Sequence, residues 1–326
     1  MQTLVTGSTG FVGAHVCRAL VEAGHAVRAF HRPASRLVAL NGVSHLVERV
    51  QGDVFDPDSI RSAMVGVDWA FHTAGRVAHW REGAALVASI VSGTKNVLDA
   101  ALAAGVRRLI FTSSVAALGV SHDGQVLDET HSFNYAPDRW PYGYAKHLAE
   151  GQVRQAAAAG LNCVIVNPTS VFGSGDLNRV AGELIIQVAR RRVPVVPPGG
   201  MNVVHVSDVA AGHLAAAERG RPGERYILGG DNLTHAEVLR VVAEEVGLRP
   251  PTLRLPAVGI ELAASAADLI RRFAPLPYNG DLLRLARYFF HYDTAKARRE
   301  LGLPAPRPFR QAIRQAVAWY RANGYL

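Results

Sequence analysis

The chain has 326 residues, of which 49% are hydrophobic and 19% are charged, so one large or two modest domains with a sizeable core are expected. The formal net charge is +8, but lysine occurs only at Lys95, Lys146 and Lys296, and the excess arginine is scattered along the whole chain. Because no basic stripe with interleaved aromatic residues is visible, the composition argues against a nucleic-acid partner.

The first predicted element is a strand at residues 3–5 that runs into a glycine-rich turn and then an amphipathic helix. Gly7 permits a tight turn, Gly10 lets a ligand approach backbone N–H groups, and Gly13 lets the helix pack closely on the strand. A pyrophosphate would sit at the helix N-terminus, where unpaired N–H groups and the helix dipole both favour an anion. This context predicts a dinucleotide site with contacts from Gly7, Thr9, Gly10, Phe11, Val12 and Gly13.

Apolar strand patterns then alternate with helical patterns as far as residue 168. The predicted strands are residues 26–30, 46–51, 69–72, 109–112 and 163–166, and the longer helices between them are residues 84–104 and 142–159. This alternation predicts an α/β fold with a Rossmann-type, doubly wound parallel sheet covered by helices on both faces. We expect residues 1–170 to form an NAD(P)-binding Rossmann domain. Residues 171–326 are expected to form a smaller, mostly helical C-terminal substrate domain that returns some elements to the main sheet.

Ligands of doubly wound sheets bind beyond the carboxyl ends of the strands, so the residues at those ends are candidates for the site. At the end of the second strand an acidic residue would bond the ribose hydroxyls of NAD, but this chain has His31 and Arg32, with Arg36 four residues later. A guanidinium suits the 2′-phosphate of NADP, which an acid would repel. Arg32 and Arg36 therefore favour NADP over NAD; the alternative is that they are ordinary solvated arginines.

The most specific pattern is Tyr142-Gly143-Tyr144-Ala145-Lys146 at the start of a predicted helix. Positions i and i+4 project on one helical face, so the Lys146 ammonium is expected near the Tyr142 phenol. A free phenol has a pKa of about 10, which is too high for an acid–base group working near neutrality, and an adjacent cation lowers it. Tyr142 and Lys146 are therefore the predicted catalytic pair, and Lys146 could also bond the nicotinamide ribose.

Together with Ser113-Ser114 at the end of the fifth strand, the glycine-rich turn and the Tyr-x-x-x-Lys helix resemble the extended short-chain dehydrogenase/reductases. This is a family of NAD(P)-dependent reductases, epimerases and dehydratases. The resemblance implies that Ser114 holds the substrate oxygen beside Tyr142. It also implies cofactor contacts from Asp53, Val54, Ala74, Gly75, Tyr142, Lys146, Pro168 and Val171. The chain looks most like the dihydroflavonol 4-reductase-like branch and its bacterial relatives called hopanoid-associated sugar epimerases.

Two positions depart from the patterns of that family. In its nucleotide-sugar dehydratases an Asp-Glu pair follows the catalytic Ser, whereas Val115 and Ala116 occupy those places here, which argues against dehydration. Ile90 replaces an Asn that in the family helps to position the catalytic Lys through water, so that role is open here.

Substrate contacts are expected from His79 and Trp80, in the loop after the fourth strand, and from Thr169 after the sixth. The alternative for His79 and Trp80 is that their loop lies on the surface and does not contact a substrate. No His-Glu-x-x-His or Cys/His cluster occurs in the sequence, so no metal site is expected.

These residues favour an NADP(H)-dependent oxidoreductase that reduces a ketone or aldehyde by hydride transfer with a Ser114–Tyr142–Lys146 triad. A nucleotide-sugar epimerase would use the same triad with a retained cofactor. A non-catalytic dinucleotide-sensing protein is the alternative from another class. Net consumption of NADPH separates the first from the second, because epimerisation leaves the cofactor unchanged overall.

The helices at residues 84–104 and 142–159 carry more small apolar residues than one sheet-facing stripe needs, and the family resemblance suggests that they pair in a homodimer. Two cysteines and no signal peptide before the first strand favour a reduced, cytoplasmic setting. Residues 255–270 are the longest apolar candidate, but they include two acids and are expected to form a core or lid helix. No membrane span is therefore predicted.

Overall fold

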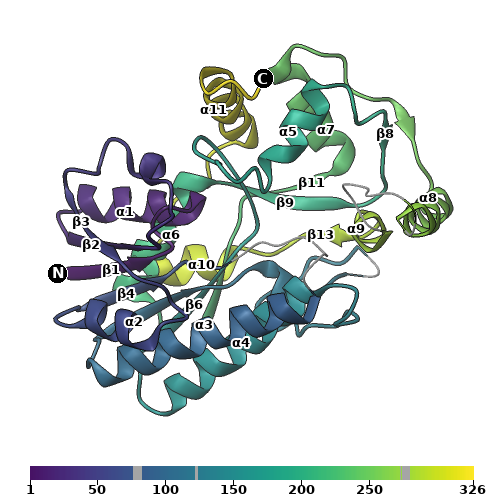
Figure 1. Cartoon of the computed structure of the whole chain (residues 1–326). Coiled ribbons are helices and arrows are strands. Elements are labelled where there is room, and N and C mark those ends of the chain that lie inside the picture. The colour runs from purple at the N-terminus through teal and green to yellow at the C-terminus, as the bar shows by residue number, and fades with distance from the viewer. Residues whose placement is uncertain (76–82, 122–123, 272, 274–279) are drawn as a thin grey trace.

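The computed structural model describes residues 1–75, 83–121, 124–271, 273 and 280–326. Its main feature is a seven-stranded sheet in the order β10-β6-β5-β4-β1-β2-β3, in which every neighbouring pair is parallel (Figure 1). The strands are β1 Gln2–Thr6, β2 Ala26–His31, β3 Val47–Gln51, β4 Trp69–His72, β5 Arg108–Thr112, β6 Cys163–Pro168 and β10 Arg225–Leu228. The chain winds outward from β1 in both directions, which confirms the predicted Rossmann-type, doubly wound fold.

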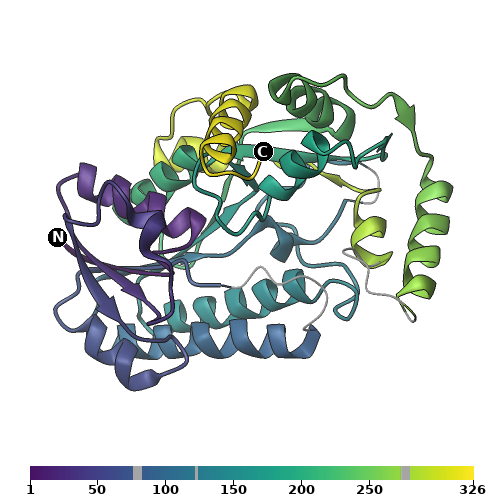
Figure 2. The ribbon, with the colours of Figure 1, turned by 45° about the horizontal axis from the view of Figure 1, so that its top comes forward.

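Helices cover both faces of this sheet because alternate strand residues point to opposite sides. Leu4 belongs to the apolar core shared with α2 Pro57–Met64, α3 Gly83–Ala103 and α4 Pro141–Ala158. Its neighbour Val5 belongs to the core shared with α1 Phe11–Glu22, α6 Val206–Arg219 and α10 Ala295–Leu301. Figures 1 and 2 show α3 and α4 side by side on one face and α1 on the other. All six residues of β6 are buried, as expected for a strand between two helical layers.

The second half of the chain builds another sheet around its own core. In this sheet β9 Gly200–His205 pairs with β11 Asp231–Thr234, β13 Phe289–Phe290 and β7 Ser170–Phe172. Its apolar core is shared with α5 Gly182–Ala189, α7 His235–Val246 and α11 Phe309–Ala322.

Shorter elements complete the described chain. They are η1 Leu37–Leu40, η2 Val115–Leu118, β8 Val195–Val196, β12 Leu253–Arg254, α8 Ala257–Ile270 and α9 Gly280–Leu285. Although β10 follows residue 170, it is an edge strand of the main sheet. The division of the chain into domains at residue 170 stays a prediction.

One helix in the described part of the chain, α3, is long and apolar enough to cross a membrane, with a mean hydropathy of 1.2 over its best window. In that window 44% of the residues are buried. Its side chains Leu86, Ile90 and Val97 lie in the core beneath the sheet, and the core helix of a globular domain meets the same two criteria.

Candidate active site

The glycine-rich turn between β1 and α1 is packed so tightly that side chains would not fit. Gly7 has a φ of +69°, and a Cβ at this position would lie 2.7 Å from the backbone of Ala74. A Cβ at Gly13 would clash with the carbonyl of Gly7 and lie 2.5 Å from Thr73 Oγ1. Backbone geometry therefore requires glycine at both places, and it brings the end of β4 against the turn.

The first turn of α1 is open to an anion. Its N-cap is Gly10, and no side chain in the described structure caps the helix. Thr9, Phe11 and Val12 are partly exposed, so a ligand can reach this end of the helix. Beneath them, the buried Ser8 hydroxyl donates to Phe30 O at 3.0 Å and ties the turn to β2. Unpaired N–H groups at a helix N-terminus suit a pyrophosphate.

The ends of β2 and β3 lie together, because Gly52 N donates to His31 O at 3.0 Å. Arg32 and Arg36 are exposed, and neither guanidinium has an ion pair or hydrogen bond among the described residues. The partly exposed Asp53 accepts a local hydrogen bond, from Phe55 N to its Oδ1 at 3.1 Å. Val54 O accepts from Asn96 on α3 at 3.0 Å, which fixes the end of β3.

The predicted catalytic side chains come from the end of β5 and the start of α4. Ser114 is the N-cap of η2, where its hydroxyl accepts from Ala116 N at 3.2 Å. Tyr142 is the second residue of α4, directly after the helix-starting Pro141. Burial raises the pKa of Tyr142 to about 12, although a hydrogen bond with the Ser114 side chain acts to lower it. The structure therefore brings Ser114 and Tyr142 together.

The Lys146 ammonium points to the strand rather than to the phenol. It is buried, donates from Nζ to Thr112 O at 2.8 Å and lies 5.1 Å from the centre of the Phe111 ring. Burial lowers the pKa of Lys146 to about 8, and the charge of Glu150 opposes that shift. The expected lowering of the phenol pKa is thus reversed in this structure, because burial outweighs the favourable contact with Ser114.

Lys146 is held here without the Asn that the family has at position 90. Gly75 passes so close that a Cβ there would lie 3.3 Å from Nζ. Ile90, which replaces the family Asn, is buried in the apolar core and offers no hydrogen bond. Lys146 is instead bonded directly to the end of β5.

His72, at the end of β4, belongs to the same site and was missed by the sequence patterns. Its Nδ1 bonds Thr6 Oγ1 at 2.8 Å, and its Nε2 lies 3.5 Å from Thr94 Oγ1. Burial and the nearby Lys146 charge lower the pKa of His72 to about 3, so the ring is neutral at physiological pH. Because the His72 imidazole is neutral, Lys146 rather than His72 carries the positive charge between the ends of β4 and β5.

Pro168 is the last residue of β6, Thr169 follows it, and Val171 lies in β7. The Thr169 hydroxyl is buried and has no hydrogen-bond partner among the described residues. Buried polar groups are normally paired, so this hydroxyl is a candidate for a ligand contact. His79 and Trp80, the other expected substrate contacts, lie outside the described residues. No group of three or more potential metal ligands occurs in the part of the chain that the structure describes.

This fold and this arrangement define a class, the extended short-chain dehydrogenase/reductases, which are NAD(P)-dependent oxidoreductases and epimerases. Residues 3–229 match the sequence model of the NAD dependent epimerase/dehydratase family, and the chain belongs to that family. The resemblance predicted from the motifs is therefore confirmed.

Similar proteins include both reductases and epimerases. The chain is 37% identical to a protein of Synechocystis sp. named as a dihydroflavonol 4-reductase, over 99% of this chain and 95% of that protein. It is also 37% identical to sterol demethylase protein B of Methylococcus capsulatus, over 100% of both. A solved structure of a nucleoside-diphosphate-sugar epimerase from Pseudomonas aeruginosa matches with a TM-score of 0.85 and 28% identity, over 100% of this chain and 99% of that one.

Proposed function

We propose that the protein is an NADP(H)-dependent reductase of a ketone or aldehyde, with Ser114, Tyr142 and Lys146 as its catalytic triad. The observation that carries this proposal is the interaction between the Ser114 and Tyr142 side chains, beside the buried Lys146 at the end of β5. At neutral pH the Tyr142 phenol keeps its proton and can donate it to a carbonyl oxygen. A pKa of about 12 also makes it a weak acid, so the proposed role requires bound cofactor and substrate to lower that pKa.

The proposed reduction needs one hydride and one proton, and the cofactor and Tyr142 account for them. NADPH, when bound, would supply a hydride to the carbonyl carbon. The Ser114 hydroxyl donates a hydrogen bond to the carbonyl oxygen, and Tyr142 gives its proton to that oxygen as the C=O double bond becomes an alcohol. The Lys146 ammonium is held on Thr112 O, and the proposed role requires it to approach the phenolate that remains, which an adjacent cation favours. The helix end at Gly10 would hold the pyrophosphate.

Aromatic residues next to the triad favour a substrate with apolar rings. Trp140, the N-cap of α4, lies 5.7 Å from Phe290 and 6.1 Å from Tyr135 between ring centres, and all three rings are partly exposed. The two relatives at 37% identity are named for a dihydroflavonol and a sterol, which are multi-ring compounds. A screen should therefore start with ring-bearing ketones and follow the loss of NADPH absorbance.

A nucleotide-sugar epimerase is the second candidate, because the similarity to the Pseudomonas aeruginosa epimerase covers the whole chain. The same screen separates the two. Conversion of a sugar nucleotide without net loss of NADPH would support the epimerase, and stoichiometric NADPH oxidation by a ketone would support the reductase.

The cofactor preference follows from the end of β2. We expect tighter binding of NADP(H) than of NAD(H), because Arg32 and Arg36 are exposed and unpaired among the described residues. Arg32→Asp should reverse that order by repelling the 2′-phosphate. Fluorescence titration of both cofactors measures this. Arg49→Asp makes the same charge change on an exposed residue within β3 and should leave the order unchanged. A wild-type preference for NAD(H) would show that the interpretation of β2 is wrong.

We also propose a homodimer that is formed by α3 and α4. A cytoplasmic location is proposed as well, because both cysteines are buried and free. Gly151 lies on α4 where an added Cβ would meet no described atom within 4 Å, so a large side chain there fits a monomer. Gly151→Arg should convert a dimer into a monomer in sedimentation at micromolar protein. Ala322→Arg, on the exposed end of α11, should leave the dimer intact. A monomeric wild-type protein would contradict the proposal.

A further inference from the structure

A fully buried carboxylate lies one helical turn beyond Lys146 on the same face of α4. The side chain of Glu150 is 0% exposed. Its Oε1 accepts from Ser113 Oγ at 2.7 Å and from Asn167 Nδ2 at 2.6 Å. Its Oε2 accepts from Arg154 at 2.8 Å and from Arg225 at 3.1 Å. Four donors from α4, β10 and the ends of β5 and β6 therefore converge on one side chain.

Two of these donors lead directly to the triad. Asn167 Nδ2 bonds Ser114 O at 3.0 Å as well as Glu150. Ser113, the second donor, is the residue before Ser114. The segment that carries the Ser114 hydroxyl is thus held from behind by the Glu150 carboxylate. Thr112 O, which accepts from Lys146, belongs to the same strand end.

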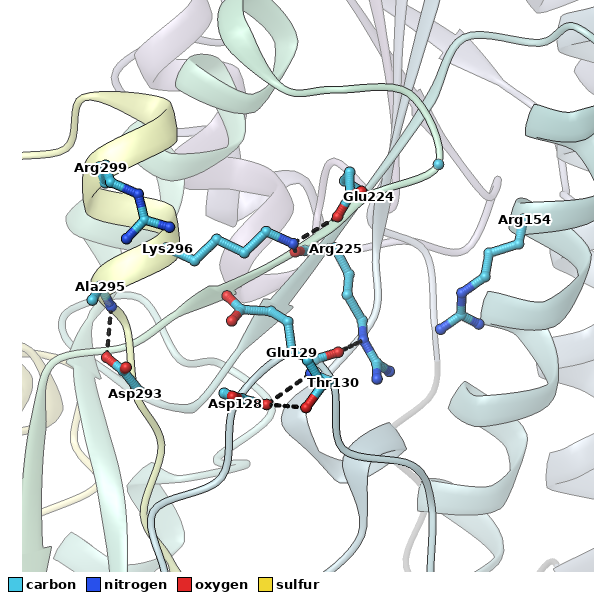
Figure 3. Close-up of a pocket in the computed structure, with 11 residues that line it drawn as sticks. Asp128, Glu129, Thr130, Arg154, Glu224, Arg225, Asp293, Ala295, Lys296 and Arg299 are labelled. Carbon is cyan, nitrogen blue, oxygen red and sulfur yellow. Dashed lines mark hydrogen bonds and ion pairs between the residues drawn. The ribbon is translucent and has the colours of Figure 1, made fainter.

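The other two donors, Arg154 and Arg225, connect the carboxylate to residues outside the triad segment. Arg225 begins β10, and it also donates to the carbonyls of Glu129 and His131 in the loop before α4. Figure 3 shows Arg225 and Arg154 on the wall of a cavity of about 520 Å³. Arg154 is partly exposed there, whereas Glu150 is not. Glu150 is therefore the fully buried member of the ionic group that it forms with Arg154 and Arg225.

Buried ion pairs are weak evidence for stability, because desolvation offsets much of their attraction. Stability alone therefore does not explain why a buried carboxylate with four hydrogen-bond donors lies here. The hydrogen bonds that link Glu150 to the segment bearing Ser114 suggest a role in the active site. We propose that Glu150 is a positioning residue of the triad, which fixes the segment bearing Ser114 and sustains the positive charge of Lys146. This inference rests on the proposed function.

The charge effect has a definite sign. Lys146 faces Glu150 on α4, His72 from β4 and Tyr142 one turn earlier. His72 and Tyr142 are uncharged at neutral pH, whereas the charge of Glu150 raises the pKa of Lys146. With a pKa of about 8, the Lys146 ammonium is present below that pH and is lost as the pH rises through it. Glu150→Gln removes a stabilising negative charge, so the pKa of Lys146 should fall. Arg154→Gln removes a positive charge beside Glu150, so the pKa should rise.

The test uses the small number of lysines in the chain. With only three lysines, the Nζ signals of isotopically labelled protein can be followed individually by NMR as the pH is varied. We expect the Lys146 titration and the alkaline limb of the turnover profile to move together, to lower pH in Glu150→Gln and to higher pH in Arg154→Gln. At about pH 9, a fall of one unit in the pKa lowers the ammonium fraction about tenfold and a rise of one unit increases it about fivefold, and turnover should change accordingly. General structural damage does not produce shifts of opposite sign.

Asp99→Asn is the matched control. Its carboxylate pairs with Lys95 at 2.5 Å on the surface of α3, so this variant removes a carboxylate beside another lysine and should leave both the Lys146 titration and turnover unchanged. If neither Glu150→Gln nor Arg154→Gln moves the Lys146 titration, the inference is wrong, even where Tyr142→Phe abolishes turnover. If Glu150→Gln does not fold, an unshifted Lys146 in Arg154→Gln overturns it. A shifted Lys146 together with an unimpaired Tyr142→Phe variant would instead reject the proposed triad.

Discussion

Tyr142→Phe should lower turnover by about 10²–10⁴-fold and leave dinucleotide affinity nearly unchanged. The substitution removes one hydroxyl, the group that meets Ser114, and keeps the ring in place. Without the phenol proton, the oxygen of the substrate must take its proton from water. Steady-state turnover with a responsive ketone, together with titration of NADP(H) by fluorescence, measures both quantities.

The control for this variant lies two residues away on the same helix. Tyr144 packs against Phe133, with ring centres 5.9 Å apart, and lies about 200° around the helix from Tyr142. Tyr144→Phe should therefore keep most of the activity. Equal, small effects of the two substitutions would remove Tyr142 from the mechanism. Lys146→Met should differ from both by weakening turnover and cofactor binding, because its ammonium lies beside Gly75 as well as on Thr112 O.

The main sheet could be predicted from the sequence because both of its faces are covered. Strands buried on two sides read as continuous apolar runs, and each run in the first 170 residues corresponds to an observed strand. β8, β12 and β13 have two residues each, and such strands exist only because a distant partner pairs with them. No local pattern encodes that pairing.

The site was predictable to the extent that it follows helical spacing. Tyr142 and Lys146 were found at i and i+4, and Glu150 continues the same stripe at i+8, a signal that could have been used. The pKa of Tyr142 could not be predicted, because its direction depends on how deeply the phenol is enclosed. The unpaired Thr169 hydroxyl and the place of His72 beside Lys146 likewise depend on contacts between separate strands.

The second large effect is expected at Gly13, where the same small change can be compared at two helical glycines. In Gly13→Ala the new methyl would clash with Gly7 O and approach Thr73 Oγ1 to 2.5 Å, so the turn must move. Overpacking of this kind costs about 1–3 kcal/mol. Displacement of the turn should also weaken dinucleotide binding by about tenfold or more, since about 1.4 kcal/mol is a factor of ten.

Gly151→Ala makes the identical change on α4, where no described atom of the same chain lies within 4 Å, and there it should raise the free energy of unfolding of the single chain by about 0.5–1 kcal/mol, because alanine favours a helix over glycine. Sedimentation of the same variant measures separately what the added methyl does to the proposed α3–α4 dimer. Thermal unfolding with and without NADP(H) separates the two contributions at Gly13. The unliganded Gly13→Ala protein should unfold at a lower temperature, and the stabilisation that the cofactor adds should shrink, because a weaker complex shifts the unfolding equilibrium less. Full cofactor stabilisation in Gly13→Ala would mean that the dinucleotide does not depend on this turn.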